Sequence, residues 1–126
     1  MNMITISIDP MGAVRQTQAD KWKKRPAVLK YRAFRDKIRQ ECIDGGFELG
    51  ESFEILFYIA MPESWSKKKK ERMFMQPHDQ KPDIDNLIKS VMDALKKDEK
   101  KVWKIKALKT WHTDGFIYIY NNEELK

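Results

Sequence analysis

The chain has little of the material that several classes of protein require. Cys42 is the only cysteine among its 126 residues, so no disulfide can form within the chain. The longest apolar run, 55–61, is far too short to cross a bilayer. Residues 1–10 have neither the charged start nor the long apolar stretch of a secretory signal. We therefore expect a cytoplasmic protein that makes no contact with a membrane.

Two kinds of active site are also missing from the sequence. No glycine-rich phosphate loop is present, which argues against a nucleotide cofactor. No constellation of Ser, His and Asp, or of Cys and His, suggests a covalent nucleophile. Any reaction that this chain catalyses must therefore depend on other groups.

Positive charge is what the chain has in excess. Lys and Arg number 25 against 19 Asp and Glu, which gives a net charge of +6 and a pI near 9.4. A basic domain suits a polyanionic partner, because neutralised phosphates release their condensed counterions. A merely soluble surface explains the net charge equally well. Ten of the basic residues, with two acids, lie in 15–39, and five more, with one acid, lie in 67–72.

Hydrophobic periodicity divides the first half of the chain into three elements. Apolar and polar residues alternate over 4–9, which predicts a half-buried strand. A helix is predicted from Pro26 to the glycine pair at 45–46. Residues 53–61 are apolar at nearly every position, which indicates a central strand covered on both faces. The predicted buried face of the helix consists of Ala27, Tyr31, Phe34, Ile38 and Cys42.

The second half of the chain is predicted to contain two helices and a hairpin. Ser66 is expected to cap a short basic helix over 67–75. A longer helix over 83–96 would bury Ile84, Leu87, Ile88, Val91 and Leu95. Strands over 102–111 and 116–120 would then form a hairpin through a turn at 112–115. The predicted fold is a single α+β domain, residues 1–126, with a mixed sheet of about four strands packed against two main helices.

The most informative stretch is Lys-Pro-Asp-Ile-Asp-Asn-Leu-Ile-Lys at 81–89. Pro82 disfavours helical geometry at Lys81, so Asp83 and Asp85 fall at the start of the helix that follows. Carboxylates are the ligands that Mg²⁺ prefers, usually one or two of them together with water and substrate phosphates. Lys89 shares the helix face of Asp85 and could hold a phosphate in the transition state.

Each of these residues also has a purely structural interpretation. Aspartate at a helix start can cap backbone amides without any chemistry, and Asp85 with Lys89 could be a surface ion pair. A third metal ligand could come from Asp98 or Glu99, just before the last predicted strand pair. Those two acids could equally belong to a solvated turn, since lysines surround them.

At this point the sequence resembles the RusA family of Holliday-junction resolvases, including its phage and prophage members. The similarity rests on the stretch at 81–89, on Asp-Ala-Leu at 93–95, and on Asp-Glu-Lys-Lys-Val at 98–102. Met-Pro-Glu-Ser-Trp-Ser-Lys-Lys-Lys at 61–69 and Pro-His at 77–78 also match. Together these segments cover about residues 53–111.

The resemblance implies a crossover junction endodeoxyribonuclease of DNA recombination and repair. Such an enzyme is a homodimer that uses Mg²⁺, or Mn²⁺ in its place, to make paired nicks in four-way DNA junctions. Asp83 and Asp85 match metal-binding aspartates, and Lys89 matches the catalytic lysine. Glu99 stands where the family has its third catalytic aspartate, so either Glu99 or Asp98 is expected to complete the metal site.

The basic blocks then become the candidates for DNA contact. Trp22, inside the first block, could stack on an unpaired base or pack in a core or dimer contact. His78 is interpreted as a structural loop residue and stays outside the catalytic set. An inactive protein that only binds branched DNA, and a nuclease acting on flaps, forks or RNA, remain as alternatives. The DNA-contact candidates are Arg15, Lys21, Lys23, Lys24, Arg25, Lys67, Lys68, Lys69 and Lys81.

Overall fold

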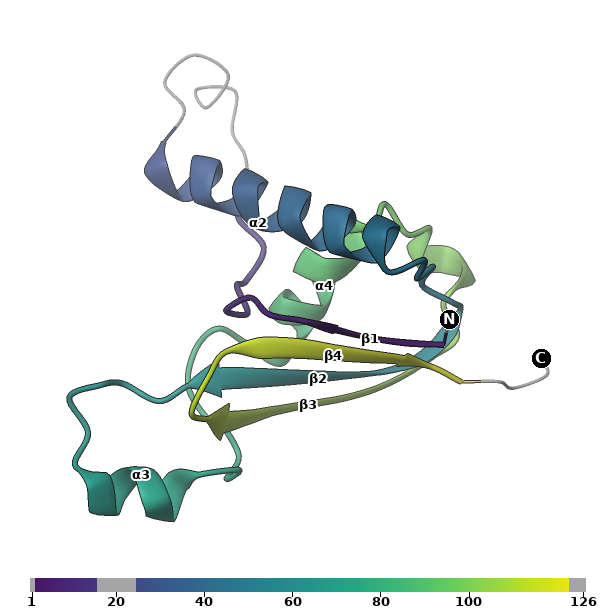
Figure 1. Ribbon diagram of the computed structural model, residues 1–126. Coiled ribbons are helices and arrows are strands. Elements are labelled where there is room, and N and C mark those ends of the chain that lie inside the picture. The colour runs from purple at the N-terminus through teal and green to yellow at the C-terminus, as the bar shows by residue number, and fades with distance from the viewer. Residues whose placement is uncertain (1, 16–24, 123–126) are drawn as a thin grey trace.

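A mixed four-stranded sheet covered on one face by helices forms the body of the protein (Figure 1). The structure, a computed structural model, describes residues 2–15 and 25–122. The predicted α+β domain with two main helices is confirmed, and a third, short helix is also present. The elements are β1 (Met3–Ile6), α2 (Pro26–Asp44), β2 (Ser52–Ala60), α3 (Lys67–Met73), α4 (Ile84–Ala94), the 3-10 helix η1 (Glu99–Lys101), β3 (Lys104–His112) and β4 (Phe116–Asn121).

The strand β2 lies inside the sheet, as its apolar sequence predicts. The strand order is β1-β4-β2-β3, and β2 pairs in parallel with β3 and antiparallel with β4. Phe53, Ile55 and Phe57 point from β2 into the main core. The prediction that both faces of β2 are covered is wrong: the alternate residues Leu56 and Tyr58 are only half-buried, on the face that neither α2 nor α4 covers.

The predicted hairpin between the last two strands is wrong. β3 and β4 do not pair with each other, because β2 lies between them. The connection at 113–115 therefore crosses the end of β2, a span of two strand spacings, or about 10 Å, which is within reach of three extended residues. Gly115 passes so close to Asp9 that a Cβ atom at this position would collide with it.

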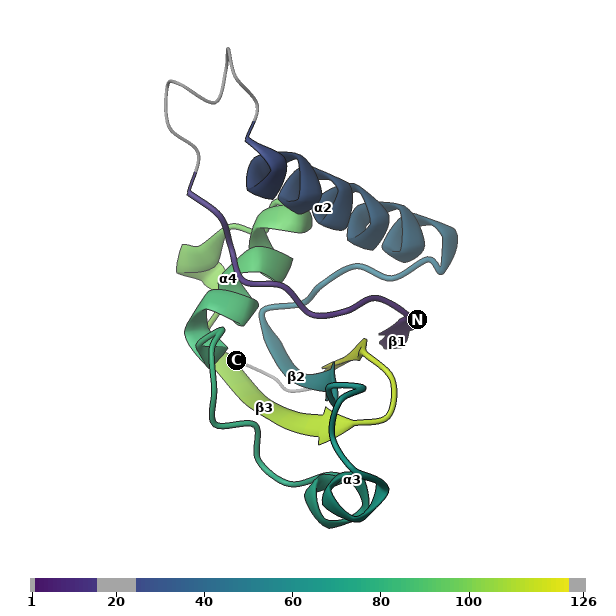
Figure 2. The same cartoon turned by 90° about the vertical axis from the view of Figure 1, so that its left-hand side faces the viewer.

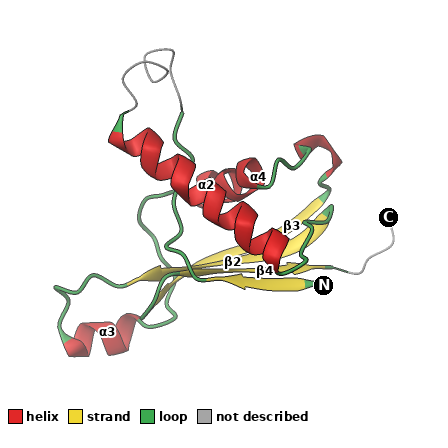
Figure 3. Ribbon diagram, turned by 45° about the horizontal axis from the view of Figure 1, so that its top comes forward, coloured by secondary structure: helices red, strands yellow, loops and turns green. Residues whose placement is uncertain are grey.

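The two long helices cover the same face of the sheet (Figures 2 and 3). In α2 the buried residues are Val28, Tyr31, Phe34, Ile38 and Cys42. The prediction for Ala27 is wrong: this residue is exposed, because the next residue, Val28, occupies the buried face in the first turn of the helix. In α4 the buried residues are Leu87, Ser90, Val91, Met92 and Ala94, whereas Ile84, Ile88 and Leu95 are half-buried.

The opposite face of the sheet is not covered by α2 or α4. Side chains alternate along strands, so the partners of the core residues lie on this open face. Leu108 is 48% exposed and Met3 is 46% exposed, and Tyr58 stacks on Phe116 with ring centroids 4.2 Å apart. We define the open face by Met3, Leu56, Tyr58, Leu108, Phe116, Tyr118 and Tyr120.

Several predicted boundaries shift by a few residues. β1 ends at Ile6, not at residue 9, and β3 begins at Lys104, not at residue 102. His112, predicted in the turn, is the last residue of β3 because Met61 donates to its carbonyl at 2.9 Å. The short helix α3 ends at Met73, two residues early, and Ser66 caps it as predicted, accepting from the Lys69 amide at 3.1 Å.

No helix in the described part of the chain is both long and apolar enough to span a membrane. Burial, and then the neighbouring Glu41, raise the pKa of Cys42 to about 11. The thiol is therefore protonated at neutral pH and is a poor nucleophile.

The position of Ile55 in the core gives a direct test of the fold. Ile55 is fully buried on β2, so Ile55→Ala should reduce the free energy of unfolding by about 2–5 kcal/mol. Ile43 is 65% exposed on α2, and Ile43→Ala should change it by less than about 0.5 kcal/mol. Urea unfolding followed by circular dichroism measures both values, and equal losses would contradict the described core.

Candidate functional site

The segment before the acid pair is held against the outer edge of β3. The Met75 amide donates to the Trp111 carbonyl at 2.8 Å, and the Trp111 amide donates to the Gln76 carbonyl at 3.0 Å. The His78 amide donates to the Lys109 carbonyl at 3.0 Å. This short antiparallel contact occupies the edge that β3 would otherwise expose, and it delivers the chain to the start of α4.

Asp83 and Asp85 lie at the exposed N-terminal end of α4, where the sequence predicts them. Both carboxylates line a surface hollow of about 590 Å³ together with Lys81, Pro82 and Asn86. Asp83 is the residue before the helix and has extended backbone geometry, with φ −66° and ψ 149°. Asp85 lies in the first helical turn. The two side chains therefore face a common, solvent-filled space.

The capping interpretation of Asp83 is not supported by the geometry. Asp83 occupies the N-cap position, yet its side chain makes no capping hydrogen bond to the first turn of α4. In contrast, the Ser66 side chain does accept such a bond at the start of α3. The Asp83 carboxylate is therefore left available for a ligand.

Lys89 lines a second hollow that adjoins the first. This hollow has a volume of about 420 Å³ and is also lined by Arg15, Asn86 and Asp93. Asn86 borders both hollows, and we refer to the two together as the depression along α4. Asp85 lines one hollow and Lys89 lines the other, and among residues 2–15 and 25–122 no ion pair joins the two side chains.

Residues 12–15 close over Asn86. The Ala13 amide donates to the Asn86 carbonyl at 3.3 Å, and the Asn86 side chain donates to the Ala13 carbonyl at 3.4 Å. Gly12 packs so tightly that a Cβ atom there would lie 2.5 Å from the Asn86 amide nitrogen. Close backbone approach at this point requires glycine, and it brings Arg15 to the rim of the depression.

Sequence reasoning missed two polar residues that support this region. The Tyr31 hydroxyl donates to Asp93 at 2.9 Å and so ties α2 to α4; burial, and then Asp93, raise the pKa of Tyr31. Lys109 on β3 donates from Nζ to the carbonyl oxygens of Gln80 and Pro82. The available signal for Lys109 was a lysine on the face of β3 that otherwise carries Ile105, Ala107 and Trp111.

The structure does not bring Asp98 and Glu99 to the acid pair within one chain. Both follow the C-terminal end of α4, whereas Asp83 precedes its N-terminal end (Figure 1). The eleven residues of α4 separate these ends by about 16 Å. Asp98 lies 4.0 Å from Lys100. The start of β3 follows the C-terminal end of α4, and only later residues of the strand, such as Lys109, reach the loop before the helix.

The donor set at the start of α4 fits a hard divalent cation held in part by substrate. In the described residues, no three Asp, Glu, His or Cys side chains lie close enough together to form a complete protein site. Mg²⁺, however, commonly binds through one or two carboxylates and fills its remaining positions with water and phosphate oxygens. Asp83 and Asp85 supply such a pair at an exposed position.

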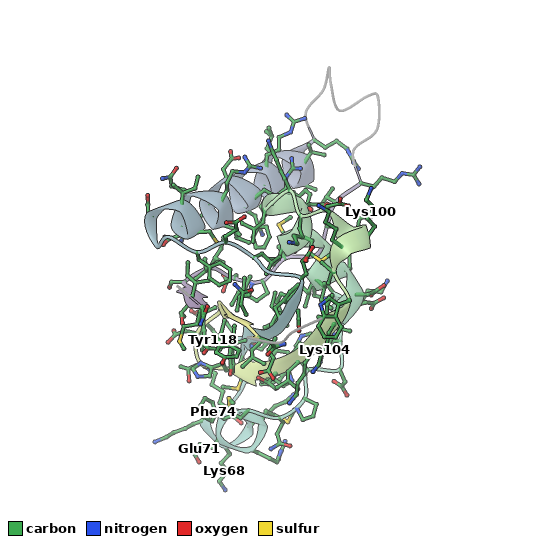
Figure 4. All side chains as sticks on the ribbon, turned by 90° about the vertical axis from the view of Figure 1, so that its right-hand side faces the viewer. Lys68, Glu71, Phe74, Lys100, Lys104 and Tyr118 are labelled. Atoms are coloured by element: carbon green, nitrogen blue, oxygen red, sulfur yellow. The ribbon has the colours of Figure 1, made fainter. Side chains whose placement is uncertain are left out.

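The DNA-contact candidates divide into four groups. Arg15 and Arg25 lie at the two ends of 16–24, where Arg25 donates to the Arg15 carbonyl at 3.1 Å. Lys21, Lys23, Lys24 and Trp22 lie outside the described residues. Lys67, Lys68 and Lys69 lie on α3; Figure 4 shows Lys68 directed away from the body, and the Lys69 ammonium lies over the Trp65 ring, 4.2 Å from its centroid. Lys81 borders the acid pair.

His78 is buried, and its ring lies 4.3 Å from the Trp111 ring, centroid to centroid. Burial, and then the charge of Lys109, lower its pKa. The imidazole is thus neutral at neutral pH and packs under the loop. These contacts agree with the structural interpretation of this residue.

Stability measurements can separate ligand binding from capping at Asp83. Because its carboxylate makes no capping bond, Asp83→Ala should change the free energy of unfolding by less than about 0.5 kcal/mol. Ser66→Ala removes a real cap and should cost about 1 kcal/mol. Thermal or urea unfolding compares the two variants with the native chain. A loss at Asp83 equal to that at Ser66 would restore the capping interpretation.

Comparison with known proteins agrees with the carboxylate pair and the basic residues found at the start of α4. The family model described as Endodeoxyribonuclease RusA matches residues 7–119. A search of curated proteins finds no match for the chain. The matched region contains the acid pair, Lys89 and all of α3. Since the match covers most of the chain, this protein belongs to the RusA family of endodeoxyribonucleases, which are hydrolases that act on DNA.

Proposed function

We propose that the protein is a Mg²⁺-dependent nuclease that resolves four-way DNA junctions by paired, symmetric nicks in DNA recombination and repair. The observation that carries the proposal is the pair Asp83 and Asp85, both exposed in one hollow beside Lys81. The Asp83 side chain makes no capping hydrogen bond to α4. Membership of the RusA family supports the same substrate class. Mn²⁺ would serve in place of Mg²⁺, because it also accepts carboxylate and water ligands.

The residues around the depression have separate tasks in this proposal. Asp83 and Asp85 would hold the cation, which when bound makes a water more acidic and neutralises charge on the phosphate. Lys89, one turn after Asp85, would bind the scissile phosphate and offset the charge that develops on it. The water oxygen bonds to phosphorus and the bond to the 3′ oxygen breaks, which leaves a 5′-phosphate and a 3′-hydroxyl that takes up a proton.

Basic segments on both sides of the acid pair support the binding of a branched polyanion. In Figure 2 the start of α4 lies between α3 and the start of α2 on one face of the molecule. The lysines of α3 lie on one side, and Arg15 and Arg25 lie on the other. Phosphates contacted at both sides would place a duplex arm across the hollow that contains Asp83 and Asp85.

Paired nicks require two active sites, and hence two copies of the chain. We propose that the open face of the sheet is where the copies meet. Its content of Tyr, Phe, Met and Leu is typical of buried interface cores, and two of its members, Leu108 and Met3, are about half exposed. Because Asp98 and Glu99 lie at the far end of α4, they could reach the acid pair only from a second copy.

The separation of the acids keeps a second function in view. If catalysis requires three acids from one chain, the metal site of this protein is incomplete. The protein would then bind branched DNA without cutting it. A nuclease acting on flaps, forks or RNA would use the same residues. Parallel digestion of those substrates and a mobile four-way junction decides among the three.

The central prediction concerns Asp85→Asn. Nicking of a four-way junction in Mg²⁺ should fall by roughly 100–1000-fold, the equivalent of a few kcal/mol of metal-derived stabilisation. Binding to the junction should be kept or slightly strengthened, since a negative charge is removed. A gel assay for cleavage and a filter or anisotropy assay for binding measure the two quantities on the same substrate.

Asp114→Asn is the matched control, because Asp114 is an exposed acid in the turn before β4. It should cut at the native rate. If Asp85→Asn also cuts at the native rate, Asp85 does not have the role assigned to it. If the native chain binds junctions yet never cuts them in Mg²⁺ or Mn²⁺, the protein is a binding module.

The dimer surface is tested by Leu108→Glu. A carboxylate on the open face should convert a dimer into a monomer, because it would be buried without a partner. Light scattering after gel filtration measures the mass in solution. Leu29, which is 47% exposed on α2, provides the control, and Leu29→Glu should stay dimeric. A native chain that is monomeric at micromolar concentration would argue against coordinated nicks.

A further inference from the structure

Lys109 lies at a position where its strand is expected to be apolar. It is aligned with the buried Phe57 of β2, on the face of β3 that also carries Ala107 and Trp111. That face packs toward α2 and α4, and Lys109 itself is only half exposed. An ammonium group held there loses part of its hydration, which is unfavourable unless other polar groups replace the water.

The groups that replace the water belong to the loop before the acid pair. Lys109 Nζ donates to the Gln80 carbonyl at 2.5 Å and to the Pro82 carbonyl at 2.8 Å. A lysine ammonium has three donors, so two of them are used on this loop. Pro82 is directly followed by Asp83, which places the second bond one residue from a proposed metal ligand.

Among the described residues, backbone–backbone hydrogen bonds do not support this loop. The pairing with β3 ends where the His78 amide donates to the Lys109 carbonyl, and the first bond of α4 runs from the Leu87 amide to the Asp83 carbonyl. Within the described chain, no backbone–backbone hydrogen bond involves residues 79–82. The two bonds from the Lys109 side chain therefore bridge the gap between the edge of β3 and α4.

From these contacts we infer that Lys109 is a positioning residue of the nuclease site. Its ammonium holds residues 80–82 against β3, and this fixes the backbone of Asp83 so that the carboxylates of Asp83 and Asp85 face the same cation. The inference rests on the proposed function, since it concerns the same metal site. The hold on the loop, however, exists without metal and can be measured without it.

The test compares Lys109→Met with Lys106→Met. Both changes remove one positive charge from β3, but Lys106 lies on the open face, where it pairs with Glu54 at 3.8 Å. Hydrogen exchange by mass spectrometry, without metal, reports on the loop. In peptides that cover 79–87, the Leu87 amide, which donates to the Asp83 carbonyl, should exchange at least about tenfold faster in Lys109→Met, while peptides from α2 and β4 stay unchanged. Lys106→Met should match the native chain at 79–87.

Metal affinity gives the second readout. Mn²⁺ binding to the free protein, followed by electron paramagnetic resonance, should weaken by about 10–100-fold in Lys109→Met, as it does when groups that orient metal ligands are removed. Junction binding without metal should fall equally in Lys109→Met and Lys106→Met, because both lose the same charge. Lys109→Arg keeps cationic donors and should recover most of the native Mn²⁺ affinity.

The outcomes separate this inference from the proposed function. Native exchange at 79–87 and native Mn²⁺ affinity in Lys109→Met would overturn the positioning role. If Lys109→Met does not fold, Lys109→Gln keeps a polar group with two N–H donors, but this side chain is one bond shorter than lysine and uncharged, so it should also loosen the loop. Exchange at 79–87 no faster than in the native chain would then overturn the role equally. If the native protein binds no Mn²⁺ and cuts no DNA, the proposed function fails, while exchange at 79–87 still decides whether Lys109 holds the loop.

Discussion

The parallel pairing of β2 with β3 is the constraint on which the rest of the structure depends. Two parallel strands cannot be joined by a tight turn, so the chain must leave one end of the sheet and return to the other. That connection, residues 61–103, contains α3, the loop with the acid pair, and α4. The elements that carry the proposed chemistry are therefore all part of one crossover.

The course of this crossover explains where the acids lie. After α3 the chain first runs along the outer edge of β3 near Trp111 and Lys109, and only then enters α4. The acid pair consequently lies near the C-terminal half of β3, whereas Asp98 and Glu99 lie near the start of that strand, beside Trp103. Helix α4 keeps the two sets of acids apart as a rigid spacer.

The two faces of the sheet serve different purposes. One face carries α2 and α4 and contains the core, so its residues determine stability. On the open face, Leu56 and Tyr118 are half-buried and Leu108 is exposed; within residues 2–15 and 25–122 neither α2 nor α4 covers this face. Polar and basic residues are instead concentrated on α3 and around the start of α2, on either side of the acid pair. This division allows association and DNA contact to use separate surfaces.

The sequence by itself determined the local features of the protein. Periodicity located both long helices, because burial on one side of a helix leaves a direct pattern of apolar residues. The nearly continuous apolar run at 53–61 located the strand that has neighbours on both edges. Pro82 and the residues after it located the acid pair at a helix start, and Ser66 located the cap of α3. The resemblance carried by 81–89 identified the family that the comparison confirmed.

Only the tertiary structure decided how these elements combine. Nothing local distinguishes a hairpin of β3 and β4 from two strands that flank β2, since both arrangements bury the same alternating residues. The distance from Asp83 to Asp98 and Glu99 depends on the direction of α4 across the sheet, which no spacing in the sequence encodes. The contact of Lys109 with Gln80 and Pro82 joins segments 27 and 29 residues apart, so it exists only once β3 has found its place beside β2.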